Sequence, residues 1–205
     1  MAGPAYRIET ERLVIRCWNP ADAAALHRTI GESLEHLKPS MPWAYEEPLT
    51  LDQRIERLRG FRAQFDRSED FIMGIFLPDE SRVIGGTGLH TRVGPDAREI
   101  GYWIHVDFVR RGLCTESSAA LTRVAFEVDG VKRVEIRCAP DNAASAAVAK
   151  RLGFRHEATL SKRFKVDEHT FRDQMVWTMF AEEFPASAAA RVKAAAFDAA
   201  GRKLL

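Results

Sequence analysis

The chain has 205 residues, 46% of them hydrophobic and 29% charged, with 30 lysines and arginines against 29 aspartates and glutamates. This length and composition are typical of one globular domain with a large core, and they exclude a disordered or fibrous protein. A net charge of +1 also argues against a general nucleic-acid binder, whose domain is normally strongly basic.

The first half of the chain predicts a strand, two helices and a hairpin. Leu13 and Ile15 share one side of a short run that is typical of a strand. Asn19-Pro20 is a helix start, because proline is tolerated at the first helical position. The expected elements are a strand ending at Arg16, helices over about 20–30 and 51–65, and an antiparallel hairpin of 71–77 with 83–89.

The second half alternates strands with helices. Glu99, Trp103 and His105 lie on one face of an expected strand, since alternate residues share a face. Asn142 can cap a helix that ends at Gly153. The expected elements are strands over 99–105 and 134–138, helices over 116–128 and 142–152, a hairpin near 164–166 and 174–180, and an Ala-rich helical tail over 186–205. A packed or frayed helix is favoured for the tail, with a partner contact as the alternative.

The turn over 107–116 joins a strand to a helix through Arg110, Arg111 and Gly112. The first N–H groups of a helix lack partners within it, so this junction can hold an anion, although such a glycine is as often structural. The turn is neither a Walker loop nor a dinucleotide fingerprint. Cys114 beside two arginines is in a setting that lowers a thiol pKa, and a covalent cysteine is the less favoured alternative.

A second segment, about thirty residues downstream, makes the interpretation of this turn more specific. It comprises Asn142, Ser145 and the block Leu152-Gly153-Phe154. Two further motifs precede them, the run over 10–16 (Thr-Glu-Arg-Leu-Val-Ile-Arg) and the strand Glu99-Ile100-Gly101-Tyr102. With these four motifs in order, the chain resembles the GNAT superfamily of acyl-CoA-dependent N-acyltransferases, in its RimJ/RimL-like branch, over about residues 8–183.

The resemblance implies a mixed α/β (α+β) fold, a single GNAT-like domain with a central mixed, mostly antiparallel twisted sheet flanked by helices. We expect this domain to span residues 1–185, with the tail over 186–205 following it. The resemblance implies acetyl-CoA as co-substrate, with the pyrophosphate loop on Val109–Cys114, where Val109 and Cys114 depart from the family pattern. The implied coenzyme-binding residues are Ile104, His105, Val106, Val109, Arg110, Arg111, Gly112, Leu113, Cys114, Thr115, Asn142 and Arg151.

Catalysis, as the resemblance implies it, is direct attack of a neutral amine on the thioester through a tetrahedral intermediate. Glu99 matches the glutamate that often acts through water as general base, and burial could raise its pKa; a salt-bridged or solvent-facing carboxylate is the alternative. Ser145 matches the serine that protonates the thiolate, or it simply packs in a helix. Tyr102 is a rival acid, but its alternation with Ile100 and Ile104 favours a core role.

The acceptor site is expected around an aromatic segment. Trp43 matches the segment that lines this site in the branch, and Phe71, Met73 and Trp103 could complete its wall, with a core role for Phe71 and Met73 as the alternative. Residues 1–90 carry 11 basic and 14 acidic side chains, against 19 and 15 in residues 91–205. We therefore expect the basic half to hold the anionic coenzyme and the acidic half to suit a cationic amine.

These patterns predict an N-acetyltransferase acting on a protein N-terminal α-amine or on a small-molecule amine. The alternatives are a non-catalytic acyl-CoA-binding regulatory module on the same fold and a generic phosphate or nucleotide binder. No metal site, nucleic-acid partner or membrane partner is expected, and a homodimer is compatible with the branch. The chain has three cysteines, Cys17, Cys114 and Cys138, and their spacing shows no pairs. Together with the lack of a secretory h-region, this predicts a cytoplasmic protein.

Overall fold

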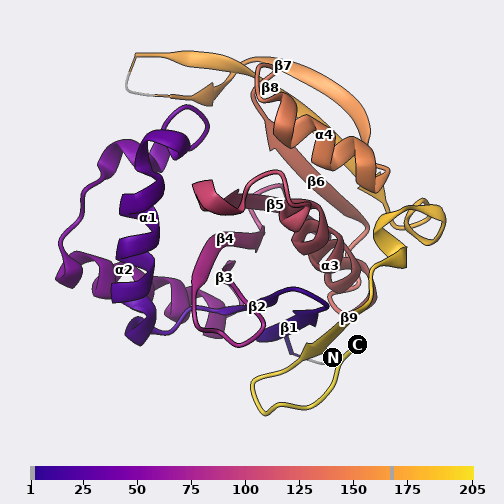
Figure 1. Cartoon of the computed structure of the whole chain (residues 1–205). Coiled ribbons are helices and arrows are strands. Elements are labelled where there is room, and N and C mark those ends of the chain that lie inside the picture. Colours follow the sequence, from indigo (N-terminus) through magenta and orange to yellow (C-terminus); the bar gives the residue numbers. More distant parts are fainter. Residues whose placement is uncertain (1–2, 167–168) are drawn as a thin grey trace.

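The computed structural model describes residues 3–166 and 169–205, and its centre is one nine-stranded sheet (Figure 1). The strands are β1 (Arg7–Thr10), β2 (Val14–Cys17), β3 (Phe71–Phe76), β4 (Val83–His90), β5 (Ala97–Ile104), β6 (Arg133–Cys138), β7 (Arg155–Lys165), β8 (Phe171–Phe180) and β9 (Ala194–Phe197). Their order in the sheet is β7-β8-β6-β5-β4-β3-β2-β1-β9. Within the described residues, β5 and β6 are the one parallel pair of neighbours, which confirms a mixed, mostly antiparallel sheet.

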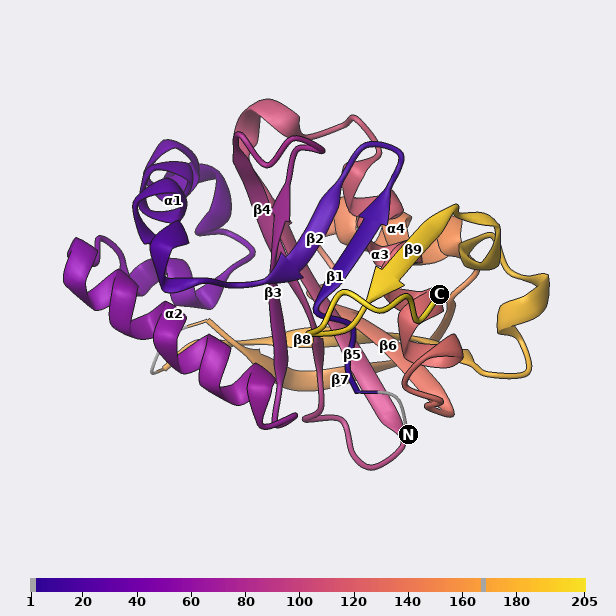
Figure 2. The same cartoon turned by 90° about the horizontal axis from the view of Figure 1, so that it is seen from below.

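In the part of the chain that the structure describes, four α-helices cover the two faces of this sheet. They are α1 (Ala23–Leu37), α2 (Leu51–Asp66), α3 (Leu113–Glu127) and α4 (Ala143–Leu152). Figures 1 and 2 show α1 and α2 on one side and α3 and α4 on the other. Two apolar clusters follow from this layering, a large one between the sheet and α3 with α4, and a smaller one beneath α1 and α2. The described chain has no helix long and apolar enough to cross a lipid bilayer.

Local sequence determines where the helices near the site begin and end. The Asn142 side chain accepts a hydrogen bond from the Ser145 amide and caps α4, as predicted. Gly153 ends α4 in the left-handed conformation, with φ 95°. Helix α3 begins at Leu113, before the expected Glu116, directly after Gly112 with φ 77°. Local sequence thus sets the first residue of α3 and both ends of α4.

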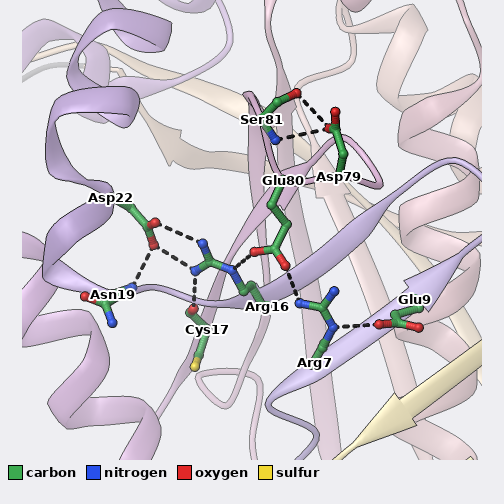
Figure 3. Close-up of polar contacts among 9 residues, drawn as sticks. All are labelled: Arg7, Glu9, Arg16, Cys17, Asn19, Asp22, Asp79, Glu80 and Ser81. Atoms are coloured by element: carbon green, nitrogen blue, oxygen red, sulfur yellow. Dashed lines mark hydrogen bonds and ion pairs between the residues drawn. The ribbon is translucent and has the colours of Figure 1, made fainter.

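An ion-pair network fixes the N-terminal strands to the turn between β3 and β4 (Figure 3). Glu80 of that turn accepts hydrogen bonds from Arg16 on β2 and from Arg7 on β1, each at 2.5 Å. Arg16 also pairs with Asp22 through two bonds of 2.8 and 2.9 Å. Because Asp22 precedes α1, this network holds the start of α1 against the sheet.

Strands β5 and β6 separate partway along their length. They pair only over Ala97–Glu99 and Arg133–Glu135, although β5 runs on to Ile104 and β6 to Cys138. Beyond Glu99 the other edge of each strand stays paired, with β4 and β8 respectively. A wedge between β5 and β6 therefore opens in the middle of the sheet, with backbone edges that are free to bind a ligand.

The N-terminal strand β1 and the C-terminal strand β9 differ from the prediction. The expected helical tail is wrong, because residues 194–197 pair with β1 as β9, after a short 3₁₀ turn at Ala189–Arg191. Alanine favours a helix in isolation, but the free edge of β1 offers a full hydrogen-bond ladder, and Ala196 is completely buried there. The boundary expected between residues 185 and 186 stays a prediction.

Candidate active site

The main cavity, of about 830 Å³, lies between the α1–α2 connection, the sheet and the first turn of α4. It reaches the wedge between β5 and β6, because Tyr102 of β5 and Cys138 of β6 both line it. The predicted site residues that line this cavity are Trp43, Met73, Glu99, Trp103, Asn142 and Ser145. The fold therefore brings both candidate catalytic residues and most of the predicted acceptor wall into one space.

Tyr102 and Ser145 form a hydroxyl pair at the wedge. The oxygen of Tyr102 lies 2.9 Å from Oγ of Ser145, and both side chains line the cavity. Burial raises the pKa of Tyr102 well above its ordinary value, so the phenol stays protonated at neutral pH. The alternation with Ile100 and Ile104 had favoured a core role, but the tyrosine is long enough for its oxygen to reach α4 beyond the core.

Glu99 lies at the point where β5 and β6 part and is 6% exposed. Its carboxylate accepts two hydrogen bonds from Arg92, at 2.9 and 2.5 Å, and Nε of Arg137 lies 4.0 Å from it. The carboxylate is therefore buried, as expected, and paired with Arg92. Sequence reasoning missed both arginines; Arg92 lies in the β4–β5 loop, where no local pattern indicates its partner.

The aromatic wall consists of Trp43 and Trp103, whose ring centroids lie 5.8 Å apart. Phe71 does not line the cavity; its ring packs against Phe65 in the large core, at 5.3 Å. Ile72, the next residue, faces the α1–α2 side and lines the cavity instead. Met73 belongs to the core and also borders the cavity. Phe71 is thus a core residue, and its neighbour Ile72 contributes to the cavity wall in its place.

The charged lining of the cavity is mostly basic. The cations are Arg54, Arg57, Arg92, Arg137, Arg163 and Lys165, and the carboxylates are Glu99 and Asp141. Carboxylates pair with the first four cations. The expected acidic acceptor site is therefore not what the lining shows, because the charge totals of the two chain halves are dominated by side chains that face solvent.

The turn before α3 has the geometry of an anion site. Arg110 and Gly112 both adopt positive φ, 61° and 77°, and no side chain caps the first turn of α3. Arg12 holds the turn in place: its Nη1 donates to the carbonyl of Arg111 at 2.9 Å, and its Nε donates to Glu116 at 2.6 Å. The N–H groups of the first turn of α3 are thus left without side-chain partners, as an anion requires.

Cys114 lies in the first turn of α3, where a low thiol pKa was expected. That expectation is wrong, since burial raises the pKa of the thiol to about 12. The side chain packs against the large core. The thiol of Cys114 is therefore protonated at neutral pH, which argues against a covalent role for it.

The other predicted coenzyme residues fall into two groups. Gly112, Thr115 and Arg151 line a second cavity of about 650 Å³ beside α3 and α4. His105 is 1% exposed and bonds to Glu32 at 2.9 Å, and its amide donates to Ile84. The amide of Val106 donates to Ser33. The side chain of His105 and these two amides thus have partners within the protein, and the assignment of His105 and Val106 to the coenzyme stays a prediction.

Comparisons with known proteins agree with this geometry. A family model described as an acetyltransferase (GNAT) domain matches residues 12–155. The ribosomal protein uS5-alanine N-acetyltransferase of Escherichia coli (strain K12) is 28% identical over 178 residues, 84% of this chain and 90% of that protein.

Two solved structures share the fold. The ribosomal L7/L12 alpha-N-protein acetyltransferase RimL in complex with coenzyme A has a TM-score of 0.74 at 21% identity, covering 83% of this chain and 95% of that chain. The microcin C7 self-immunity acetyltransferase in complex with acetyl-CoA and AMP has a TM-score of 0.75 at 21% identity, covering 83% and 93%. The chain belongs to the GNAT family, in its RimJ/RimL-like branch, and is an acetyl-CoA-dependent N-acetyltransferase.

Proposed function

We propose that this enzyme acetylates the α-amine at the N-terminus of a protein, with Glu99 and Ser145 as its catalytic residues. One observation carries the proposal: the buried carboxylate of Glu99 and the hydroxyl pair of Tyr102 and Ser145 line one cavity that reaches the β5–β6 wedge. The relative from Escherichia coli, named for the alanine of a ribosomal protein, supports a peptide N-terminus over a small-molecule amine.

The described residues fit acetyl-CoA. The uncapped first turn of α3 and the left-handed Gly112 would hold the pyrophosphate, and the wedge would take the pantetheine arm along the free edges of β5 and β6. Asn142 would meet that arm with its amide group, which here donates to Ser40 at 3.2 Å. When bound, the coenzyme supplies an activated acyl carbonyl and a thiolate leaving group.

The residues of the chain then handle protons. Glu99, held by Arg92, accepts a proton from the incoming amine through water, because only the neutral amine has a lone pair for attack. After the amine has added to the acyl carbonyl and the C–S bond breaks, Ser145 would donate its proton to the departing sulfur, and solvent would return a proton to the serine. Tyr102, 2.9 Å away, would hold the Ser145 hydroxyl in position through their hydrogen bond.

The test is a thiol-release assay with three peptides: one with a free N-terminus, one with the N-terminus blocked and a lysine present, and one with neither amine. We expect turnover only with the free N-terminus. Glu99→Gln and Ser145→Ala should each lower kcat by about 10²–10⁴-fold and leave the Kd for coenzyme A within about threefold. Ser118→Ala, which removes a buried hydroxyl of α3 without a hydrogen-bond partner, is the matched control and should retain wild-type kcat.

Coenzyme A binding without turnover on any amine would contradict the catalytic proposal and support a binding module. Full activity of both Glu99→Gln and Ser145→Ala would reject these two residues as the proton carriers. Turnover on the lysine of the blocked peptide alone would reject the α-amine as the acceptor.

A further inference from the structure

The C-terminal tail forms one wall of the second cavity, outside the segment that the family model matches. This cavity, of about 650 Å³, lies between the first turn of α3, the end of α4 and residues 188–193 of the tail. Its lining includes Gly112 and Thr115 of the anion turn and Arg191 and Lys193 of the tail. The tail therefore borders the same space as the turn to which we assign the pyrophosphate.

Among the described residues that line this cavity, cations without a carboxylate partner outnumber unpaired carboxylates. Arg12 and Glu116 neutralise one another at 2.6 Å. Arg151 reaches only the hydroxyl of Thr115, at 3.5 Å. Arg191 and Lys193 are exposed and have no carboxylate partner within residues 3–166 and 169–205. Three unpaired cations thus face one unpaired carboxylate, Glu11, across the cavity.

The tail backbone is fixed at this position. Arg123 of α3 donates from Nη1 to the carbonyl of Val192 at 2.9 Å. The 3₁₀ turn at Ala189–Arg191 precedes this bond, and the ladder of β9 with β1 follows it. Ala189 is fully buried. Arg191 and Lys193 are therefore carried on an anchored segment, although their side chains are exposed.

We propose that Arg191 and Lys193, with Arg151, form a subsite for the phosphate monoester of coenzyme A, the 3′-phosphate of its ribose. This inference rests on the proposed coenzyme site. A phosphate monoester carries nearly two negative charges at neutral pH, which suits a cluster of unpaired cations, and arginine binds such a group through two N–H donors. The diphosphate and the monoester of one coenzyme are then bound by adjoining parts of one surface.

The test compares coenzyme A with dephospho-coenzyme A, which lacks only the 3′-phosphate, by isothermal titration calorimetry. We expect the wild type to bind coenzyme A about tenfold or more tightly than dephospho-coenzyme A. The double variant Arg191→Ala/Lys193→Ala should lose that preference, with a rise of about 5–20-fold in the Kd for coenzyme A and less than twofold for dephospho-coenzyme A. Melting temperatures of all variants show that each remains folded.

The matched control is Arg59→Ala/Arg67→Ala, which removes the same charge from exposed positions of α2 and its end. This control should keep the wild-type preference for coenzyme A over dephospho-coenzyme A. A general effect of lost positive charge would instead reduce the preference in the control as well. Equal weakening of both ligands in the tail variant, or no change in either, would overturn the subsite. The subsite would also be overturned if the tail variant lost binding of inorganic phosphate while the wild type bound coenzyme A and dephospho-coenzyme A equally well. Failure of the wild type to bind either coenzyme would instead reject the proposed function.

Discussion

Tyr102 and Ser145 come from different elements, and their oxygens meet because the β5–β6 wedge leaves room for a long side chain to cross to α4. A buried phenol with a raised pKa is a poor acid alone, since it gives up its proton reluctantly. Beside a serine it serves as a fixed hydrogen-bond partner that orients the serine hydroxyl. Tyr102 is thus a positioning residue for Ser145 in the proposed reaction.

Replacing Tyr102 by phenylalanine tests this role at the scale of one atom. We expect Tyr102→Phe to lower kcat by about tenfold and to change KM for the peptide by less than twofold, because the hydroxyl acts on Ser145 rather than on the peptide. Tyr6→Phe is the matched control: it removes a hydroxyl that bonds Asp66 at 2.8 Å, and kcat should not change. A rise in KM with unchanged kcat would show that Tyr102 binds the peptide instead.

The sequence could predict residues whose role follows from a local pattern. Asn142 caps α4 and Gly153 ends it because the conformations they need are local. The pairing of Glu99 with Arg92 and Arg137 could not be predicted, since it depends on a loop and on a strand that is distant in sequence. The pKa of Cys114 could not be predicted from the sequence either. Its place at a helix start beside two arginines predicts a lowered thiol pKa, but burial among residues distant in sequence raises it.

At the scale of elements, the turn between β3 and β4 supplies the carboxylate that joins the first two strands (Figure 3). Burial opposes the charge on Glu80, but hydrogen bonds from Arg16 and Arg7 outweigh it and hold the pKa of Glu80 below its ordinary value. A carboxyl whose pKa is lowered on folding stabilises the folded state above its unfolded pKa, about 4.3. That contribution disappears as the pH falls through the lowered pKa.

Glu80→Gln should therefore reduce the free energy of unfolding by about 0.5–1 kcal/mol at pH 7, a modest value because the pair is partly exposed. The difference from the wild type should shrink as the pH falls below the ordinary glutamate pKa of about 4.3 and through the lowered pKa of Glu80, where the wild-type carboxyl also loses its charge. Urea unfolding at pH 7, 5, 4 and 3 measures it. Glu69→Gln, in a more exposed pair with Arg67, is the control and should change the free energy less. A difference that stays constant down to pH 3 would contradict the ion-pair account.

Helices and strands with a regular spacing of apolar residues could be predicted from the sequence. Strands whose partners lie far away in the sequence could not. The hairpin of β3 with β4 and helices α2 and α4 follow from apolar spacing and caps. Strand β1 buries only Ile8 within its four residues, and its partner β9 lies at the far end of the chain. An Ala-rich segment has no strand pattern of its own, so its pairing is decided by the free edge that β1 offers.

At the scale of the whole molecule, function depends on a sheet that is complete at its ends and open in its middle. The outer strands continue the sheet as far as β9 on one side and β7 on the other. The parallel contact between β5 and β6 ends after three residue pairs. Helix α3 lies near that opening with its uncapped first turn, and α4 contributes Ser145 to it. The fold therefore places an anion site and a hydroxyl pair along one unpaired edge.

Hydrogen exchange tests whether coenzyme A occupies this opening. Amides along the free edge of β5 lack a ladder partner and should exchange quickly in the free protein. Saturating coenzyme A should slow exchange by about tenfold or more in 100–104, 112–115 and 136–138, because a ligand at 100 times its Kd stabilises the bound state by about 2.7 kcal/mol. Helix α2, which lies on the other side of the sheet from α3 and α4, should be unchanged and is the internal control. Slowing confined to 112–115 would place the coenzyme on the anion turn alone, and slowing in α2 without change in β5 would reject the wedge as the coenzyme site.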